Sequence, residues 1–405
     1  MTATMKLLVF GHQLEIGGTQ VNAIDLAAAL RDRHGFDVTF FATRGPMVKL
    51  VEEKGLRYVE APDARFHPSF TRMRALRQVV RNLRPNLIHA WDWYQCLDAY
   101  FSVFLPMRVP LVVTDMMMSV NGVLPKRLPT TFGTPELCDQ ASAQGRRKVE
   151  LMLPPIDVEH NSPQSVSSTA FRLKYGIRTN EILIVTVSRL TEWMKLDSII
   201  RTIKAIEQLG REFPIRFVLA GDGTARQKIE HKAASVNEKL NRQAITLTGA
   251  VLDPRPIYNA ADIVVGMGGS ALRGMSFGKP VIVVGEQGFC ELFGPNTADS
   301  FLYHGIYGRG SGEPGCQSLV RKCRGLIEQP DRRLSLGEFS RRFVKEHFAL
   351  AAVSKRLAAF CEQSALMERS LASTAVDSIR TVGTYFRYRS FRIESRAAGR
   401  LQNRF

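Results

Sequence analysis

Short apolar runs alternate with helix-period segments along both halves of this 405-residue chain, and this alternation constrains the fold more than any other feature. Parallel strands buried on both faces read as continuous apolar runs, and they need helical crossovers between them. The runs occupy residues 7–10, 38–42, 87–90 and 111–114, then 181–188, 217–220, 245–248, 263–265 and 281–284. The pattern predicts an α/β protein with two Rossmann-like, doubly wound domains.

A break in the alternation predicts where the two domains separate. Pro154-Pro155 and the polar stretch at 159–168 indicate a linker. We therefore expect an N-terminal Rossmann-like domain over residues 1–160 and a C-terminal one over residues 161–345. A helix at 346–365 that packs back on the body and a basic, aromatic tail at 366–405 would follow.

The tail contributes to a net charge of +17, which predicts an anionic partner. From Arg380 onward there are seven arginines and one glutamate. On a helical wheel two sets align on adjacent faces: Phe386, Ile393, Ala397 and Leu401, and Arg389, Arg392, Arg396 and Arg400. This pattern fits a membrane-surface helix, a helix packing on the body or a poorly ordered tail, and does not decide among them.

The sequence shows neither a signal-peptide pattern nor a transmembrane segment. The apolar run at 7–10 is too short for a signal peptide, and no stretch approaches the ~20 apolar residues that span a bilayer. The six cysteines are scattered, which argues against a disulfide scaffold or a structural zinc site. We expect a cytoplasmic protein, located at the inner face of the membrane if the tail makes peripheral membrane contact.

Glycine-rich turns follow predicted strands in both halves. They are Gly17-Gly18-Thr19, with Thr19 as the expected N-cap, Gly221-Asp222-Gly223, and Gly268-Gly269-Ser270. Glycine lets the backbone approach a ligand closely, and the free N–H groups at a helix N-terminus attract phosphate. The alternative for each motif is a simple chain turn.

Two cations, Arg189 and Lys195, follow the strand at 181–188, and Lys195 begins the next helix. Cations at the carboxyl edge of a parallel sheet are well placed to hold a diphosphate. The alternative is a pair of surface residues without a ligand.

Taken together and in this order, these motifs make residues 5–365 resemble the retaining nucleotide-sugar glycosyltransferases of family 4, which have the GT-B fold. The segments in register are Gly17–Thr19, 87–90, Ser188-Arg189-Leu190 with Lys195, Gly221–Gly223, Ala261-Asp262, 277–281 and Gly288 with Glu291-Leu292. The resemblance implies transfer of a hexose, with retained configuration, from a nucleotide diphosphate sugar to a saccharide or lipid-linked acceptor. It also implies an interdomain cleft as the site and bacterial envelope or exopolysaccharide synthesis as the setting.

The resemblance implies a role for each matching residue. Arg189 and Lys195 correspond to the family's diphosphate-binding pair and would stabilise the leaving group. Gly17, Gly18 and Thr19 would face the donor from the N-terminal domain, whereas Gly221, Gly268, Gly269 and Ser270 would lie on its C-terminal side. No metal or other cofactor is implied, and the nucleotide sugar is a co-substrate.

The chain departs from the family pattern on the donor side. Val265 and Arg273 stand where the family usually carries two glutamates. An arginine cannot accept hydrogen bonds from ribose hydroxyls, so we expect Arg273 to contact phosphate instead. Glu286 and Glu291, in and after the next loop, are predicted to compensate, with Glu286 on the ribose.

The acceptor side departs as well, because Thr114-Asp115-Met116 replaces the usual Thr-x-His. His89 and Asp115 are predicted near the reacting sugar. In the same segment Trp91 and Trp93 would stack on acceptor rings and Asp92 would bind hydroxyls. The alternative is that this strand end simply packs on the core.

The absence of the usual family residues keeps an alternative function open. In that alternative the protein is a non-catalytic GT-B relative that binds a nucleotide, glycan or protein partner. Nucleic-acid binding is not predicted, because no recognition motif is present.

Overall fold

A computed structural model describes residues 4–64, 66–310, 315–368 and 370–397, with side chains described up to residue 390. Its contacts divide the chain into two compact units. The N-terminal unit comprises Met1–Leu153 and Val353–Phe405, and the C-terminal unit comprises Pro154–Ala352. The N-terminal unit is therefore made of two separate segments, with the C-terminal unit inserted between them.

A seven-stranded parallel sheet forms the centre of the N-terminal unit, in the order β3-β2-β1-β4-β5-β6-β7. The order reverses beside β1, as in doubly wound folds. The strands are β1 (Lys6–Phe10), β2 (Asp37–Thr43), β3 (Arg57–Ala61), β4 (Leu87–Trp91), β5 (Leu111–Asp115), β6 (Thr130–Phe132) and β7 (Val149–Leu151). The four apolar runs form β1, β2, β4 and β5. The other three strands were not predicted, because β3 is a charged edge strand and β6 and β7 have three residues each.

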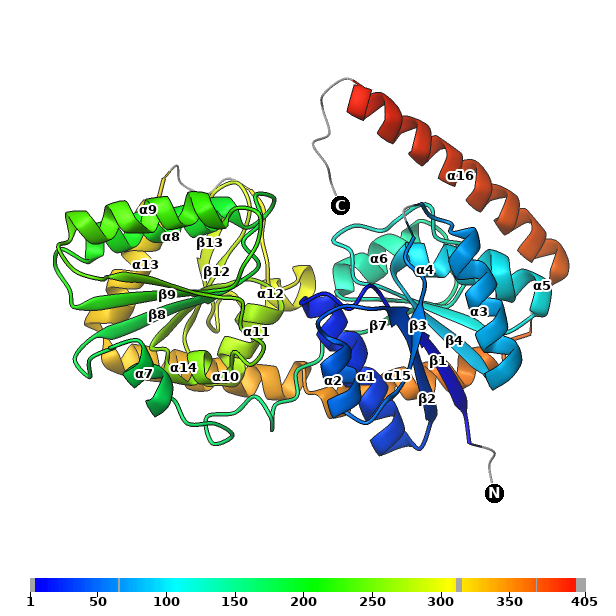
Figure 1. Cartoon of the computed structure of the whole chain (residues 1–405), viewed down its shortest axis with the longest axis horizontal. Coiled ribbons are helices and arrows are strands. Elements are labelled where there is room, and N and C mark those ends of the chain that lie inside the picture. Colours follow the sequence, from blue (N-terminus) through cyan, green and yellow to red (C-terminus); the bar gives the residue numbers. More distant parts are fainter. Residues whose placement is uncertain (1–3, 65, 311–314, 369, 398–405) are drawn as a thin grey trace. The chain divides into compact units, whose positions relative to one another are not determined.

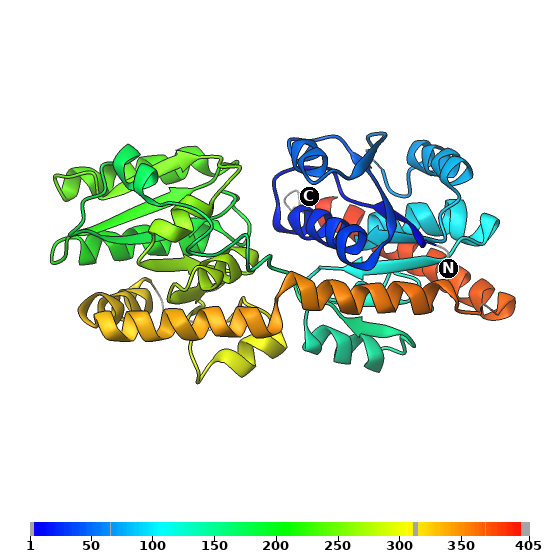
Figure 2. The same ribbon diagram turned by 90° about the horizontal axis from the view of Figure 1, so that it is seen from below.

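Helices cover both faces of this sheet (Figure 1). On one face, α3 (Phe70–Leu83), α4 (Asp92–Ala99) and a π-helical turn (Tyr100–Phe104) share a core with β1, β4 and β5. On the other, α1 (Gly18–His34) lies beside α15 (Leu350–Ala365), where His34 Nε2 is 3.2 Å from Ser354 Oγ (Figure 2). The shorter helices are α2 (Val48–Glu53), α5 (Leu105–Met107) and α6 (Pro135–Ala143).

The C-terminal segment forms α16 (Leu371–Ala397), which packs on the N-terminal unit (Figure 1). Tyr385 and Tyr388 join the core that contains α4, and the Asp377 carboxylate accepts hydrogen bonds from the backbone N–H groups of Lys126 and Arg127 at 3.1 and 2.9 Å. Of the three alternatives for the tail, the described part is a helix packing on the body. The remaining wheel positions, Arg392, Ile393, Arg396, Ala397, Arg400 and Leu401, fall outside the described side chains.

The C-terminal unit repeats the doubly wound order in a six-stranded sheet, β10-β9-β8-β11-β12-β13. Only the short edge strand β13 (Cys290–Leu292), which was not predicted, is antiparallel. The other strands are β8 (Ile182–Val187), β9 (Ile215–Ala220), β10 (Ile245–Gly249), β11 (Ile263–Gly266) and β12 (Val281–Val284). Two doubly wound α/β units confirm the predicted fold class.

Helices also flank this second sheet (Figure 1). On one face lie α8 (Leu196–Leu209), α9 (Arg226–Lys239) and α13 (Gln317–Glu328); on the other lie α10 (Arg255–Ala260), α11 (Gly269–Ser276) and α14 (Pro330–His347). Two further helices are α7 (Thr169–Lys174) and α12 (Ala298–His304). Among the described residues of both units, no helix combines the length and the apolar character needed to cross a bilayer.

Candidate functional site

Arg189 and Lys195 lie at the carboxyl edge of the C-terminal sheet, in the segment that connects β8 to α8. Arg189 is exposed, and Lys195 is half-buried at the N-cap position of α8. The pKa of Lys195 is lowered to about 8, first by burial and then by the charge of Arg189, while the Glu286 carboxylate acts in the opposite direction. These three charged groups therefore lie close enough to interact.

The neighbouring strand β11 leads into the start of α11, where the sequence predicts a phosphate contact. Gly268 adopts φ 56°, a conformation that favours glycine, and its N–H donates to the Ile306 carbonyl at 2.6 Å. The N-cap residue Gly268 makes no side-chain capping bond, and a helix start of this kind can bind an anion through its N–H groups. Arg273 folds back toward the same end of the helix, with Nη1 3.5 Å from the Gly269 carbonyl. Gly268, Gly269, Ser270 and Arg273 thus lie together.

Gly221 and Gly223 pack closely against the segment that carries Arg189. A Cβ at Gly221 would lie 1.8 Å from the Ser188 carbonyl oxygen, and one at Gly223 would lie 2.4 Å from that of Leu190. Both glycines let the turn after β9 pack against the backbone on either side of Arg189. The close packing of Gly221 thus positions the segment that carries Arg189, and a donor contact of Gly221 stays a prediction.

The two glutamates proposed to compensate on the donor side are in different surroundings. Glu286 follows β12, interacts electrostatically with Lys195 and lies 3.6 Å from Arg309 Nε. Glu291 lies in β13, where its Oε2 is 3.0 Å from Lys322 Nζ on α13. The structure therefore brings Glu286, but not Glu291, to the cationic pair.

A second cluster of functional groups lies at the carboxyl edge of the N-terminal sheet, after the adjacent strands β1, β4 and β5. Asp92 begins α4 with φ 58°, an uncommon conformation for a residue other than glycine. Its Oδ2 lies 2.6 Å from His12 Nε2, an ion-pair contact that lacks hydrogen-bond geometry, and its Oδ1 accepts a hydrogen bond from the Met116 N–H at 2.9 Å. His12, whose side chain is 23% exposed, was missed in the sequence. Its position directly after Gly11, at the end of the first strand, was the available signal.

Asp115 ends β5 and is fully buried. Its Oδ1 accepts a hydrogen bond from the Met117 N–H at 3.0 Å, whereas Oδ2 has no hydrogen-bond partner among the described residues. Burial, followed by the neighbouring Asp92 charge, raises the pKa of Asp115 far above its usual value. Asp115 is thus electrostatically coupled to Asp92 but is closed off from direct contact with a ligand.

The other residues predicted for the acceptor side belong to the core. His89 Nε2 lies 2.6 Å from Thr114 Oγ1, and burial lowers the pKa of His89 to about 3, so the imidazole is neutral. Trp91 is 0% exposed and Trp93 3%, and the Trp93 ring stacks on Tyr94. Buried rings offer no face to a sugar, so the roles predicted for His89, Trp91 and Trp93 are corrected to core packing.

The glycine loop of the N-terminal unit lies at the same edge as His12. Gly17 is the N-cap of α1 and makes no side-chain capping bond. Thr19 is the second residue of the helix, which corrects its prediction as the N-cap. Gln20 Nε2 donates to the Gln13 carbonyl at 3.1 Å and thereby closes the loop over residues 13–20. The first turn of α1, which begins at Gly18, lacks a side-chain cap as well.

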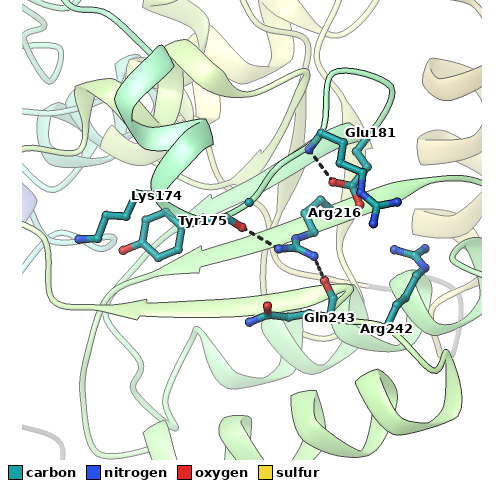
Figure 3. Close-up of a pocket in the computed structure, with 8 residues that line it drawn as sticks. Lys174, Tyr175, Glu181, Arg216, Arg242 and Gln243 are labelled. Carbon is teal, nitrogen blue, oxygen red and sulfur yellow. Dashed lines mark hydrogen bonds between the residues drawn. The ribbon is translucent and has the colours of Figure 1, made fainter.

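A hollow of about 510 Å³ lies at the amino ends of β8, β9 and β10, the sheet edge opposite Arg189 (Figure 3). Arg216 donates through Nη2 to the Tyr175 carbonyl at 2.7 Å and through Nη1 to the Gln243 carbonyl. Arg242 Nη1 donates to the Ile215 carbonyl at 2.7 Å. These arginines bind the loops of this edge together, and no residue of the predicted site lies here.

Two family models match the chain, one in each of its two units. Residues 16–115 match the family model described as Glycosyltransferase Family 4, and residues 181–305 match the one described as Glycosyl transferases group 1. No curated protein sequence matches the chain significantly.

Solved structures with a similar fold cover most of the chain. A glycosyltransferase from Rickettsia africae ESF-5 has a TM-score of 0.73 at 13% identity over 90% of this chain and 100% of its own. Anabaena Alr3699/HepE, in complex with UDP and glucose, has a TM-score of 0.69 at 16% identity over 89% and 100%. WaaG, a glycosyltransferase involved in lipopolysaccharide biosynthesis, has a TM-score of 0.60 at 14% identity over 88% and 99%.

The fold and the two domain matches define the class: this chain is a glycosyltransferase of the GT-B fold. More particularly, its N-terminal unit carries a family 4 domain and its C-terminal unit a group 1 domain.

Proposed function

We propose that the protein transfers a hexose from a nucleotide diphosphate sugar to a saccharide or lipid-linked acceptor, with retained configuration. The observation that carries this proposal is the interacting pair Arg189 and Lys195 at the carboxyl edge of the C-terminal sheet. We place the reaction in the cytoplasm, in envelope or exopolysaccharide synthesis. The UDP and glucose bound to HepE and the involvement of WaaG in lipopolysaccharide biosynthesis support the donor class and this setting.

On the donor side, breaking the glycosidic bond leaves negative charge on the departing diphosphate. Arg189 and Lys195 supply two cations at one sheet edge, and Arg273 adds a third beside the uncapped N-terminus of α11. Fixed positive groups of this kind stabilise the leaving group without reorganisation during the reaction. We propose that they do so without a divalent metal, and that Glu286 accepts hydrogen bonds from the donor ribose.

On the acceptor side, the contact between His12 and Asp92 favours a second candidate, transfer with inversion. A carboxylate that orients an imidazole is a recurring arrangement for a general base. His12 would take the proton of the acceptor hydroxyl as that oxygen attacks the anomeric carbon and the nucleoside diphosphate leaves. In the retaining reaction the departing phosphate takes this proton instead. The anomeric configuration of the product, determined by NMR, separates the two candidates.

Thermal-shift binding tests the donor site directly. We expect one nucleoside diphosphate among UDP, GDP and ADP to raise the melting temperature by several degrees. Arg189→Ala and Lys195→Ala should each abolish the shift, because each removes a cation from the diphosphate. Lys174→Ala, an exposed lysine at the opposite sheet edge, serves as the control and should keep the shift. A flat response of the wild-type protein to all nucleotides would favour the non-catalytic alternative.

Donor affinity should also depend on pH through Lys195. Because the pKa of Lys195 is lowered to about 8, its ammonium is charged below this value and loses its proton as the pH rises. We expect diphosphate binding to weaken about tenfold from about pH 7 to about pH 9, while the diphosphate itself stays ionised. Isothermal titration with Lys195→Arg, which stays charged across this range, should give a flat profile. An equally steep profile in that variant would assign the pH dependence to another group.

A further inference from the structure

The outward face of α16 exposes a continuous apolar stripe. Val376, Ile379 and Phe386 are 67%, 75% and 60% exposed, and Val382 lies between them. They follow one another at intervals of three or four residues and therefore share one side of the helix. Large exposed apolar side chains concentrated in this way indicate an interaction surface.

The opposite face of α16 packs on the rest of the N-terminal unit. Asp377 and Thr381 are buried, and Ser378 Oγ lies 2.8 Å from the Tyr100 hydroxyl. Arg380 donates to the carbonyls of Gly122 and Leu124 at 3.0 and 2.8 Å. These contacts fix the rotation of the helix, so that the apolar stripe points away from the core of the N-terminal unit.

Charge distinguishes the kinds of partner that this stripe could meet. Arg387 and Arg389 are exposed, and the helical period places one on each side of the stripe. Long basic side chains flanking an apolar face match a lipid surface, where the apolar groups enter the acyl boundary and the guanidinium groups meet phosphate. A second copy of the same face would instead bring arginines together. The excess of six positive charges from Arg380 onward favours an anionic bilayer.

The inner face of α16 also reaches the acceptor-side cluster. The Tyr385 hydroxyl donates a hydrogen bond to the His67 carbonyl, and His67 Nδ1 lies 2.9 Å from Arg72 Nη2. The pKa of His67 is lowered to about 4 by burial, then by Arg72 and by His12, which places His67 near the His12–Asp92 pair. A surface bound by the outer face of α16 would therefore lie about 10 Å, one helix diameter, beyond this contact.

We propose that α16 is an interfacial helix that holds the N-terminal unit on an anionic phospholipid surface through Val376, Ile379 and Phe386, flanked by Arg387 and Arg389. Membrane attachment stands on α16 alone. The further consequence, that the acceptor is lipid-linked, rests on the proposed glycosyltransferase function.

Vesicle flotation of the full chain tests the attachment. The wild-type protein should float with phosphatidylcholine vesicles that contain about 30 mol% phosphatidylglycerol and much less with pure phosphatidylcholine. Ile379→Asp combined with Phe386→Asp should lower the bound fraction at least about tenfold, because each change places a charge in the apolar layer. Arg387→Glu combined with Arg389→Glu should remove the preference for phosphatidylglycerol. Leu173→Asp combined with Leu334→Asp, two exposed leucines of the C-terminal unit, should bind like the wild type.

Two results would overturn the proposal. One is equal flotation of the Ile379→Asp/Phe386→Asp variant and the wild type. The other is a wild-type protein that does not float but sediments as a dimer, which that variant converts to a monomer; the stripe would then bind a second copy. Nucleotide thermal shifts, which depend on the C-terminal unit, should be the same in the wild type and the α16 variants. Attachment can therefore fail while the proposed function stands.

Discussion

His12→Ala is expected to lower the rate of sugar transfer by about 10²–10⁴-fold while leaving nucleoside diphosphate binding unchanged. The reason is geometric: His12 Nε2 lies 2.6 Å from Asp92 Oδ2, and the imidazole is partly exposed at the edge of the N-terminal sheet. The variant would remove the group that positions or deprotonates the acceptor hydroxyl. Asp92→Asn should produce a comparable loss, because the amide would not balance a developing imidazolium charge.

The measurement is single-turnover transfer with saturating donor, compared with donor affinity from calorimetry. His231→Ala, an exposed histidine on α9, is the control for general effects of losing an imidazole and should transfer at the wild-type rate. A His12→Ala enzyme with full transfer activity would eliminate the base, and the retaining mechanism would then gain support.

Asp98→Ala is expected to destabilise the N-terminal unit by about 3–5 kcal/mol. Asp98 is fully buried, its Oδ2 is 2.7 Å from Arg72 Nη2, and its Oδ1 accepts a hydrogen bond from the Ser69 N–H at 2.7 Å. Arg72 lies in α3 and is buried in this ion pair. Removing the carboxylate would leave a buried guanidinium charge without an anionic partner.

Urea unfolding monitored by tryptophan fluorescence measures this effect. Trp91 and Trp93 report on the N-terminal unit once Trp193, the third tryptophan, is replaced by phenylalanine. Glu60→Ala removes the exposed ion pair with Arg44, which has a similar N–O distance of 2.8 Å, and should cost less than about 1 kcal/mol. Asp98→Leu combined with Arg72→Met should be less destabilising than Asp98→Ala, because neither charge remains buried. Equal stability of Asp98→Ala and the wild type would contradict the assigned role.

The fold was largely predictable because the central strands are long continuous apolar runs, whereas β6, β7 and β13 are too short to produce a pattern. The position of Arg189 and Lys195 at the carboxyl edge of the sheet was predictable because both lie in the short segment between a strand and the next helix. The acceptor side was not. His12 and Asp92 are far apart in the chain, and their contact exists only because β1 and β4 are hydrogen-bonded neighbours. Every residue of β4 is buried, so no alternation revealed that Trp91 belongs to the core.

The C-terminal unit is inserted between two segments of the N-terminal unit, so during synthesis the whole C-terminal unit is made before the last segment of the N-terminal unit. A ribosome releases the N-terminal sheet first, but α15 and α16, which cover α1 and the loop at residues 122–127, emerge after residue 350. Domains usually fold as units while the chain is still being made. Here the continuous C-terminal unit can fold before the N-terminal unit is complete, because the N-terminal unit still lacks α16 at that stage. A nascent chain that stops before α16 would contain the strands and helices of the C-terminal unit but would expose the apolar residues of the N-terminal unit that Tyr385 and Tyr388 cover.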